Sequence, residues 1–398
     1  MGTSAGSKIA TSGLIFHYDL GSDRSYAGAP VTNSQWNSGS EVPPWKANGS
    51  GTPNVDVTGT AEAGPIKTAK TWKFIKDGTS SQWNGWEGTY GVWTGSSGDI
   101  WTTSYWYKTN NAAGATNFGV GAFYLSDWSR AYNYTVLSTR DTIIADGKWR
   151  YNYTVTRLNE NYTNAIIVDG PSWGYSTSPG VLYINGLQWN KNSYATKFAK
   201  GTRTSSQSVL NLANTATIDG NLSYAYDGTP YFNGPTSFDY LYATESYSNR
   251  GTNSFTYEAW FNHIDDNGYD KIILGKPGGH TGLMAWSNQR GFRLLNAAGD
   301  TFYDAFVTDS YNTWVHMVGT YEYGVGSKLY INGVLAASNN FTGSLSDRGT
   351  TLHIGGNVGW NANYSQHGYI DIARVYNRVL SANEVATNFA AQRARFGI

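Results

Sequence analysis

Short segments of alternating or aromatic-rich sequence recur along the whole chain, separated by turns that contain glycine or asparagine. Only one segment, near the C-terminus, has helical periodicity. Trp, Tyr and Phe make up 15% of the 398 residues, and glycine occurs 47 times. Aromatic and β-branched residues favour strands, and this aromatic content excludes a disordered chain. The sequence therefore predicts an all-β protein that is long enough for two β-sandwich modules.

Charge and cysteine content exclude several classes of partner and site. The formal net charge is zero, which gives no electrostatic attraction to nucleic acid or to an anionic membrane. The chain has no Cys, so it can form neither disulfides nor thiolate metal sites. Residues 1–12 are small and polar without the apolar core of a signal peptide, and no other stretch could span a bilayer. We predict a flexible arm at residues 1–12, no nucleic-acid partner and no membrane insertion.

Two successive sets of strands are expected. The clearest in the first half are Lys70–Ile75, Thr102–Tyr107, Asn117–Tyr124, Trp149–Val155 and Asn164–Val168. The second set comprises Ser254–Asn262, Lys271–Gly275, Gly291–Leu295, Trp314–Tyr321, Ser327–Ile331, Thr351–Gly355 and Tyr369–Tyr376. A single short helix follows at Ser381–Arg393, because Ser381 and Glu384 have the spacing of a capping box.

Four ordered motifs carry a resemblance in the second half. They are Phe255–Phe261 (FTYEAWF), Trp314–Tyr321 (WVHMVGTY), Lys328–Val334 (KLYINGV) and Gly368–Ser381 (GYIDIARVYNRVLS). This half resembles the laminin G-like, concanavalin A-like superfamily, which implies a β-sandwich but specifies no ligand. The end of the chain, Phe389–Ile398, is similar to laminin G-like structural proteins of tailed bacteriophages.

The first half resembles carbohydrate-binding modules with a jelly-roll fold, through Val181–Trp189 and the exit Gly201–Arg203. Gly13–Tyr18 instead resembles the opening of a phage laminin G-like domain, whose expected continuation begins only at Ser208. We therefore predict a laminin G-like sandwich formed by residues 13–29 and 203–398, with a jelly roll inserted at residues 30–202. Gly13–Tyr18 should then pair with Tyr369–Tyr376, because related domains place their first and last strands side by side.

The sequence shows no residues arranged for catalysis. Glucanases of this fold place carboxylates alternately on one strand, so that an acid and a nucleophile flank the glycosidic bond, and no such run occurs here. We predict no enzymatic activity and no cofactor. Asp265, Asp266 and Asp270 form the densest acidic cluster; they are weak calcium candidates, and a solvated hairpin tip is the alternative.

Binding residues are more visible, because sugars stack their C–H faces on aromatic rings while amides and carboxylates bind the hydroxyl groups. One glycine-rich segment supplies the candidate glycan site, which comprises Trp83, Asn84, Trp86, Glu87, Tyr90 and Trp93. These Trp residues could equally belong to a core or to a protein interface, and the sequence leaves the three alternatives open. In the second half, Trp286 and Trp360 occur in polar, loop-like contexts, whereas Trp260 and Trp314 are expected in the core.

The resemblances imply a non-enzymatic structural protein of a bacteriophage virion, either a tail fibre or appendage subunit or a capsid decoration. Its expected location is the virion surface after synthesis in the host cytoplasm, and its expected partners are other virion proteins and a host-surface glycan. Homo-oligomerisation is compatible with this role. The alternatives are a purely architectural virion protein and an extracellular bacterial carbohydrate-binding adhesin.

Overall fold

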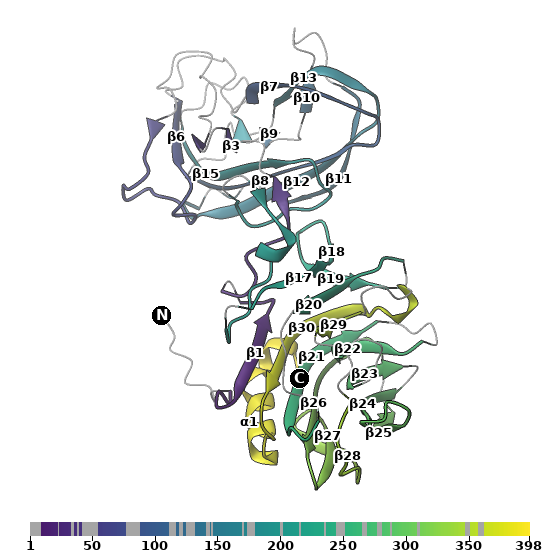
Figure 1. The fold of residues 1–398 in the computed structure, drawn as a ribbon. Helices are drawn as coiled ribbons and strands as arrows, with labels where there is room; N and C mark the ends of the chain where they lie inside the picture. Colours follow the sequence, from purple (N-terminus) through teal and green to yellow (C-terminus); the bar gives the residue numbers. More distant parts are fainter. Residues whose placement is uncertain are drawn as a thin grey trace. The chain divides into compact units, whose positions relative to one another are not determined.

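A computed structural model gives the fold of the chain. The residues that it describes are 9–22, 24–32, 36–37, 40–41, 55–76, 88–110, 117–118, 122–124, 132–140, 144, 146–168, 171–172, 180–199, 202–214, 216–234, 236–243, 251–264, 269–276, 281–286, 289–308, 311–346, 351–356 and 362–398. The chain divides into two compact units (Figure 1). Unit 1 contains residues 1–27, 205–223 and 230–398, and unit 2 contains residues 28–204 and 224–229.

Unit 1 is a sandwich of an eight-stranded and a seven-stranded antiparallel sheet. The eight-stranded sheet has the order β18 (Ser223–Tyr224), β19 (Pro230–Asn233), β30 (His367–Tyr376), β21 (Phe255–His263), β26 (Trp314–Glu322), β27 (Gly326–Ile331) and β28 (Val334–Asn339), with β1 (Leu14–Asp19) also on β30. The seven-stranded sheet has the order β17 (Ile218–Asn221), β20 (Tyr240–Ala243), β29 (Leu352–Ile354), β22 (Lys271–Gly275), β23 (Gly282–Trp286), β24 (Gln289–Leu295) and β25 (Phe302–Thr308). The remaining elements are helix α1 (Ala382–Gln392) and the short 3₁₀ segments η1 (Ser205–Gln207), η3 (Ala362–Tyr364) and η4 (Arg393–Phe396).

Aromatic side chains hold the two sheets of unit 1 together. Phe255 and Tyr257 on β21 contact Phe292 on β24, with ring centroids 6.0 and 6.5 Å apart. Because side chains alternate along a strand, Trp260 lies on the opposite face of β21, where it stacks on Phe389 of α1 at 5.7 Å. The central strand β21 is therefore covered on both faces of the eight-stranded sheet and is buried almost throughout. The seven-stranded sheet has its second face turned away from the sandwich core.

The first strand of the chain belongs to unit 1. Antiparallel pairing joins Leu14 to Tyr376 and Asp19 to Ile372, which confirms the predicted pairing of residues 13–18 with residues 369–376. The chain just before this strand is also held, since the Ala10 N–H donates to Asn388 Oδ1 at 2.7 Å. The expected flexible arm therefore does not include Ala10; residues 1–8 lie outside the described part of the chain.

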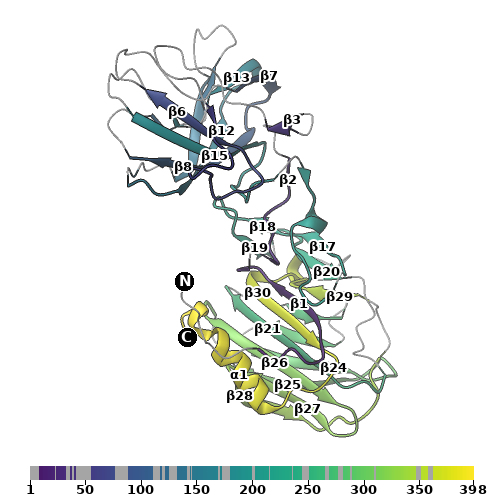
Figure 2. The ribbon, with the colours of Figure 1, turned by 90° about the vertical axis from the view of Figure 1, so that its left-hand side faces the viewer.

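The predicted C-terminal helix is present as α1. Ser381 accepts a hydrogen bond from the Glu384 N–H, and Glu384 accepts one from the Ser381 N–H, so the capping box is confirmed. Figures 1 and 2 both show α1 along one side of the eight-stranded sheet. Val385 is buried there, with Tyr376 and Leu380 in the same apolar cluster. Helix α1 therefore completes the core on the outer side of this sheet.

Unit 2 is also a β-sandwich. Its larger sheet has the order β11 (Tyr134–Arg140), β12 (Arg150–Leu158), β8 (Ile100–Thr109), β15 (Gly180–Asn190), β6 (Thr71–Lys76) and β5 (Val55–Asp56), and a three-stranded sheet has the order β10 (Ala122–Tyr124), β13 (Tyr162–Val168) and β7 (Gly88–Gly95). Three strand pairs complete the described part: β14 (Pro171–Ser172) with β9 (Asn117–Phe118), β16 (Thr202–Arg203) with β2 (Val31–Thr32), and β3 (Trp36–Asn37) with β4 (Ser40–Glu41). Its core is rich in aromatic residues, including Trp72, Trp101, Tyr105, Tyr107 and Trp189.

The segment that forms most of unit 2 leaves and re-enters unit 1 at neighbouring positions. Tyr26 and Val209 form a β-bridge, and the Ala27 N–H donates to the Ser208 carbonyl at 2.9 Å. Replacing residues 28–204 by a short glycine linker is therefore expected to leave unit 1 folded, because a shorter loop lowers the entropy cost of closing the chain. Calorimetry should show one cooperative transition, with far-ultraviolet circular dichroism of a β-protein. A chain that unfolds without a cooperative transition would contradict this expectation.

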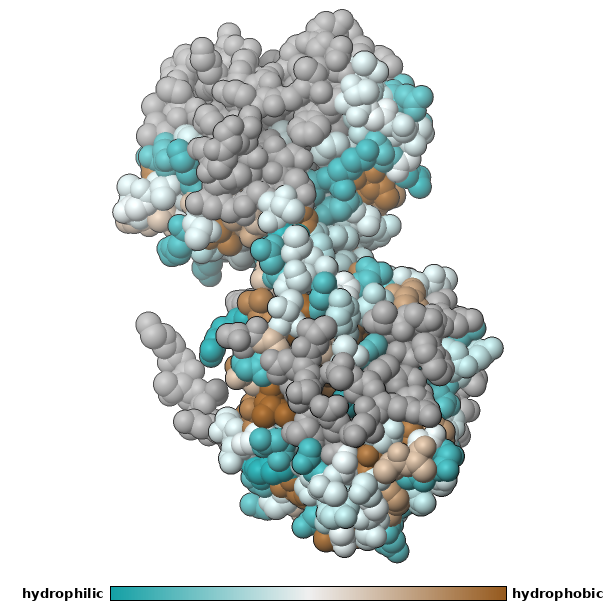
Figure 3. Space-filling model, in the orientation of Figure 1, coloured by the Kyte–Doolittle hydropathy of each residue, from teal (hydrophilic) through white to brown (hydrophobic). Residues whose placement is uncertain are grey.

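Hydrophobic residues visible on one face of the molecule lie in small separate groups (Figure 3). Among the described residues, no helix is both long and apolar enough to cross a membrane.

Candidate glycan-binding site

Most of the aromatic segment proposed from the sequence lies outside the described residues. Trp83, Asn84, Trp86 and Glu87 belong to residues 77–87, for which no structure is described. Tyr90 and Trp93 lie in β7, where the backbone of Trp93 is paired with Ala165 of β13. Trp360 also lies outside the described residues. The structure therefore does not decide whether the Trp residues of this segment contact glycan, belong to the core or form a protein interface, and the glycan site stays a prediction.

The calcium candidates are only partly described. Asp265 and Asp266 lie outside the described residues, whereas Asp270 forms an ion pair with Arg293, with Oδ2 and Nη1 2.9 Å apart. Within the described part of the chain, no group of three or more Asp, Glu or His side chains is arranged to hold a metal ion. Asp270 is thus paired with Arg293, and Arg293 also belongs to a second cluster of side chains on the same sheet.

The outer face of the seven-stranded sheet carries a cluster that we call the Arg293 platform, which comprises Trp286, Arg293, Phe302, Asp304 and Phe306. Arg293 on β24 is the cross-strand partner of Asp304 on β25, and its Nε and Nη2 donate to that carboxylate at 3.0 and 3.2 Å. The guanidinium carbon lies 5.0 Å from the ring centroid of Trp286, 4.8 Å from that of Phe302 and 5.9 Å from that of Phe306. These distances are within the range of cation–π attraction.

Strand alternation turns the platform away from the core. Phe292, the neighbour of Arg293, contacts the eight-stranded sheet, so Arg293 lies on the other face. Gly291 is the cross-strand partner of Phe306, and a Cβ at Gly291 would lie only 1.6 Å from the Phe306 ring. Glycine at this position therefore leaves the space that the Phe306 ring occupies. Trp286 meets the same ring edge to face, with centroids 3.8 Å apart.

Electrostatics keep the Arg293 side chain charged and fixed. Burial alone would lower its pKa, but hydrogen bonds and charges from Asp304 and Asp270 outweigh burial and raise the pKa. Both carboxylates remain accessible, with side-chain exposures of 26% for Asp304 and 42% for Asp270. Since a carboxylate has about four acceptor positions, both can accept further hydrogen bonds. The two carboxylates thus provide hydrogen-bond acceptors that Arg293 holds in place beside the aromatic rings of the platform.

The rings of the platform are accessible. Phe302 is 46% exposed, and Trp286 and Phe306 are partly exposed. Partly exposed rings beside fixed carboxylates can stack on the C–H face of a sugar and accept hydrogen bonds from its hydroxyl groups. The sequence indicated only Trp286, through its polar context; it is the last residue of β23, not a loop residue.

A second group of ionisable residues in unit 1 is closed to ligands. Glu258, His316 and Arg374 have fully buried side chains between the eight-stranded sheet and α1. Burial alone would raise the pKa of Glu258, but the charge of Arg374 and hydrogen bonds from His316 and Tyr376 lower it to about 2. Because no ligand can reach these groups, they stabilise the fold and form no candidate site.

Comparison with known families agrees with the geometry of unit 1. Residues 235–386 match the family described as the concanavalin A-like lectin/glucanases superfamily. These residues form a laminin G-like domain. It is a β-sandwich of the type that carbohydrate-binding proteins use, and the Arg293 platform lies within it. A search of curated proteins gives no match.

Solved structures similar to this chain include two neurotoxin domains. The binding domain of botulinum neurotoxin serotype D is 14% identical, with a TM-score of 0.40 over 47% of this chain and 49% of that chain. The receptor binding domain of botulinum neurotoxin type G is 15% identical, with a TM-score of 0.37 over 46% of this chain and 48% of that chain. The similarity spans about half the length of these structures.

Proposed function

We propose that this chain is a non-catalytic glycan-binding protein of a bacteriophage virion and that its laminin G-like domain contacts sugar through the Arg293 platform. The platform carries the proposal: three accessible rings surround the Arg293 guanidinium, which is held by Asp304 of the platform and by the neighbouring Asp270. The family match supports the same function, because lectins and glucanases share this sandwich.

The virion role has a separate basis, which is the resemblance of Phe389–Ile398 to laminin G-like structural proteins of tailed phages. Mass spectrometry of purified virions is expected to detect the chain. Its absence from virions, together with glycan binding, would favour a bacterial adhesin.

Replacing Phe302 or Trp286 with alanine is expected to weaken glycan binding. Loss of a stacking ring costs about 1–3 kcal/mol by analogy with base stacking, which corresponds to roughly one to two decades in affinity. A glycan array would first identify the best-bound sugar, and calorimetric titration would then give the affinity of each variant. The bound glycan should release no reducing ends during the titration.

Tyr323→Ala is the matched control, because Tyr323 is 45% exposed and lies outside the platform. This variant should retain the affinity of the original chain. Equal affinity of the Phe302, Trp286 and Tyr323 variants would contradict a platform contact. No binding of the original chain to any arrayed glycan would favour a purely architectural protein.

The segment that contains Trp83, Trp86, Tyr90 and Trp93 remains a proposed second contact, supported by its spacing of rings and amides. Calcium at Asp265, Asp266 and Asp270 also remains a proposal, which titration of the chain with Ca²⁺ would test. Other virion proteins and further copies of this chain are the proposed protein partners.

A further inference from the structure

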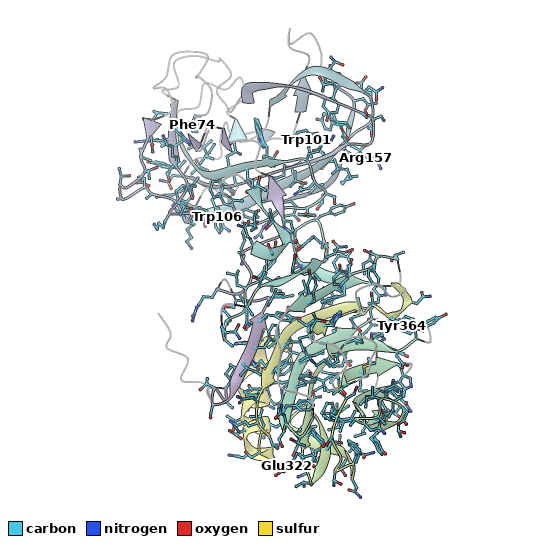
Figure 4. All side chains as sticks on the ribbon, in the orientation of Figure 1. Phe74, Trp101, Trp106, Arg157, Glu322 and Tyr364 are labelled. Carbon is cyan, nitrogen blue, oxygen red and sulfur yellow. The ribbon has the colours of Figure 1, made fainter. Side chains whose placement is uncertain are left out.

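The larger sheet of unit 2 has an aromatic outer face in addition to its aromatic core. Trp101, Tyr105 and Tyr107 of β8 belong to the core, so the alternating residues Trp106 and Lys108 lie on the other face. Figure 4 shows Trp106 on one side of this sheet, with Trp101 and Phe74 on the opposite side. Trp106 contacts Tyr151 of β12 at 5.5 Å, and Tyr151 contacts Tyr153 at 6.4 Å.

One row of this outer face alternates rings with ammonium groups. Tyr183 on β15 is the cross-strand partner of Lys108 on β8 and of Lys73 on β6. The Lys108 Nζ lies 5.4 Å and the Lys73 Nζ 5.8 Å from the centroid of the Tyr183 ring. Trp149, just before β12, reaches the same ring edge to face at 6.5 Å. We call Lys73, Lys108, Trp149 and Tyr183 the ring–ammonium row, and all four are partly exposed.

The charge of this row is only partly balanced within the described residues. Three neighbouring ion pairs are Lys108 with Glu62 at 2.6 Å, Lys70 with Asp56 at 3.3 Å and Arg150 with Asp146 at 2.6 Å. None of these pairs includes Lys73. The row therefore presents one positive charge beside Tyr183 that these carboxylates do not neutralise, and a second that is paired with Glu62.

We infer that the ring–ammonium row binds an anionic polysaccharide whose sugars carry carboxylate or sulfate groups. Tyr183 and Trp149 would stack on the C–H faces of successive sugars, and the two ammonium groups would donate hydrogen bonds to the acidic substituents. Neighbouring strands lie about 4.8 Å apart, so the row from Trp149 to Lys73 extends roughly 14 Å and spans more than one sugar. This surface lies on unit 2 and is independent of the Arg293 platform.

Titration calorimetry of the full-length protein with polygalacturonate tests the inference, and fully methyl-esterified polygalacturonate is the matched neutral ligand. Polygalacturonate should bind with an affinity that falls as salt rises, and the ester should bind at least about tenfold more weakly, because its ammonium contacts are lost. Dextran sulfate as a third ligand shows whether sulfate replaces carboxylate.

Four substitutions distinguish a loss of ligand contacts in the ring–ammonium row from a loss of folding. Tyr183→Ala should lower the affinity for polygalacturonate about tenfold, and Lys73→Met about two- to fivefold. Glu62→Gln should raise the affinity, since it releases Lys108 from its partner. Lys191→Met is the control on the same unit, because Lys191 pairs with Asp99 at the other end of β8. Unchanged thermal transitions would show that each variant is folded.

Three results would overturn the inference. Equal affinity for polygalacturonate and its ester would show that the ammonium groups make no contact with the ligand. Tighter binding of single-stranded oligothymidylate than of either acidic polysaccharide would identify a nucleic-acid surface. If Tyr183→Ala, Lys73→Met and Glu62→Gln all leave the affinity unchanged, the polysaccharide binds elsewhere on the protein. The Phe302→Ala experiment would still test the Arg293 platform separately.

Discussion

Replacing Glu258 with glutamine is expected to destabilise unit 1 by about 3–5 kcal/mol, because the change leaves a buried arginine without its counter-ion. The Glu258 carboxylate accepts hydrogen bonds from Arg374 Nη1 at 2.7 Å and His316 Nε2 at 3.0 Å. It accepts two more, from the Tyr376 hydroxyl at 3.0 Å and Asn388 Nδ2 at 2.8 Å. Glutamine keeps the size of the side chain but removes the charge and one acceptor.

Scanning calorimetry measures the effect as a fall of roughly 6–20 °C in the melting temperature of the unit 1 transition. Glu322→Gln is the matched control, because Glu322 is exposed on β26 and should shift the transition by less than about 0.5 kcal/mol. If both variants melt together with the original chain, the buried charges do not stabilise the fold. A further consequence concerns Ala10, which binds Asn388 and should exchange its amide hydrogen faster in the Glu258 variant.

The fold of unit 1 could be predicted well from the sequence, for a physical reason. The central strands β21 and β26 of the eight-stranded sheet are buried on both faces, so they appear as long apolar segments that a family pattern can match. The capping box of α1 was equally visible, because it depends on two residues three apart. Among the strands that the sequence did not indicate, β11 and β28 are exposed or partly exposed throughout; β28 carries Val334 and Leu335 at 69% and 52% exposure.

The candidate sites could not be predicted in the same way. Arg293, Asp270 and Asp304 come from three separate segments, and only the pairing of β24 with β25 brings Arg293 beside Asp304. Tyr183 and Lys73 are likewise more than a hundred positions apart in the chain. Alternation predicts which face a residue takes, but the register between distant strands decides which side chains meet.

Acid is expected to destabilise unit 1 before the buried Glu258 carboxylate is protonated, because His17 and His353 are held neutral in the folded state. Burial, followed by the charge of Arg374, lowers the pKa of His17 from 6.5 to about 4. Burial is also the main cause for His353, whose pKa falls to about 4. Each folded pKa lies below the unfolded value, so the stabilisation is complete above pH 6.5 and is lost as the pH falls toward 4.

Each histidine should cost about 2–3 kcal/mol of unfolding free energy between pH 7 and pH 4. Urea denaturation at several pH values measures this loss for the original chain and for a variant with both His17→Gln and His353→Gln. The variant should lose much less stability than the original chain in this range, since glutamine does not titrate. Below pH 4 both proteins should lose stability in parallel as Glu258 is protonated toward its pKa of about 2. If the unfolding free energies of the two proteins instead fall in parallel from pH 7 to pH 4, His17 and His353 do not couple folding to pH. A loss of stability confined to the range below pH 4 would leave Glu258 as the main acid-sensitive group.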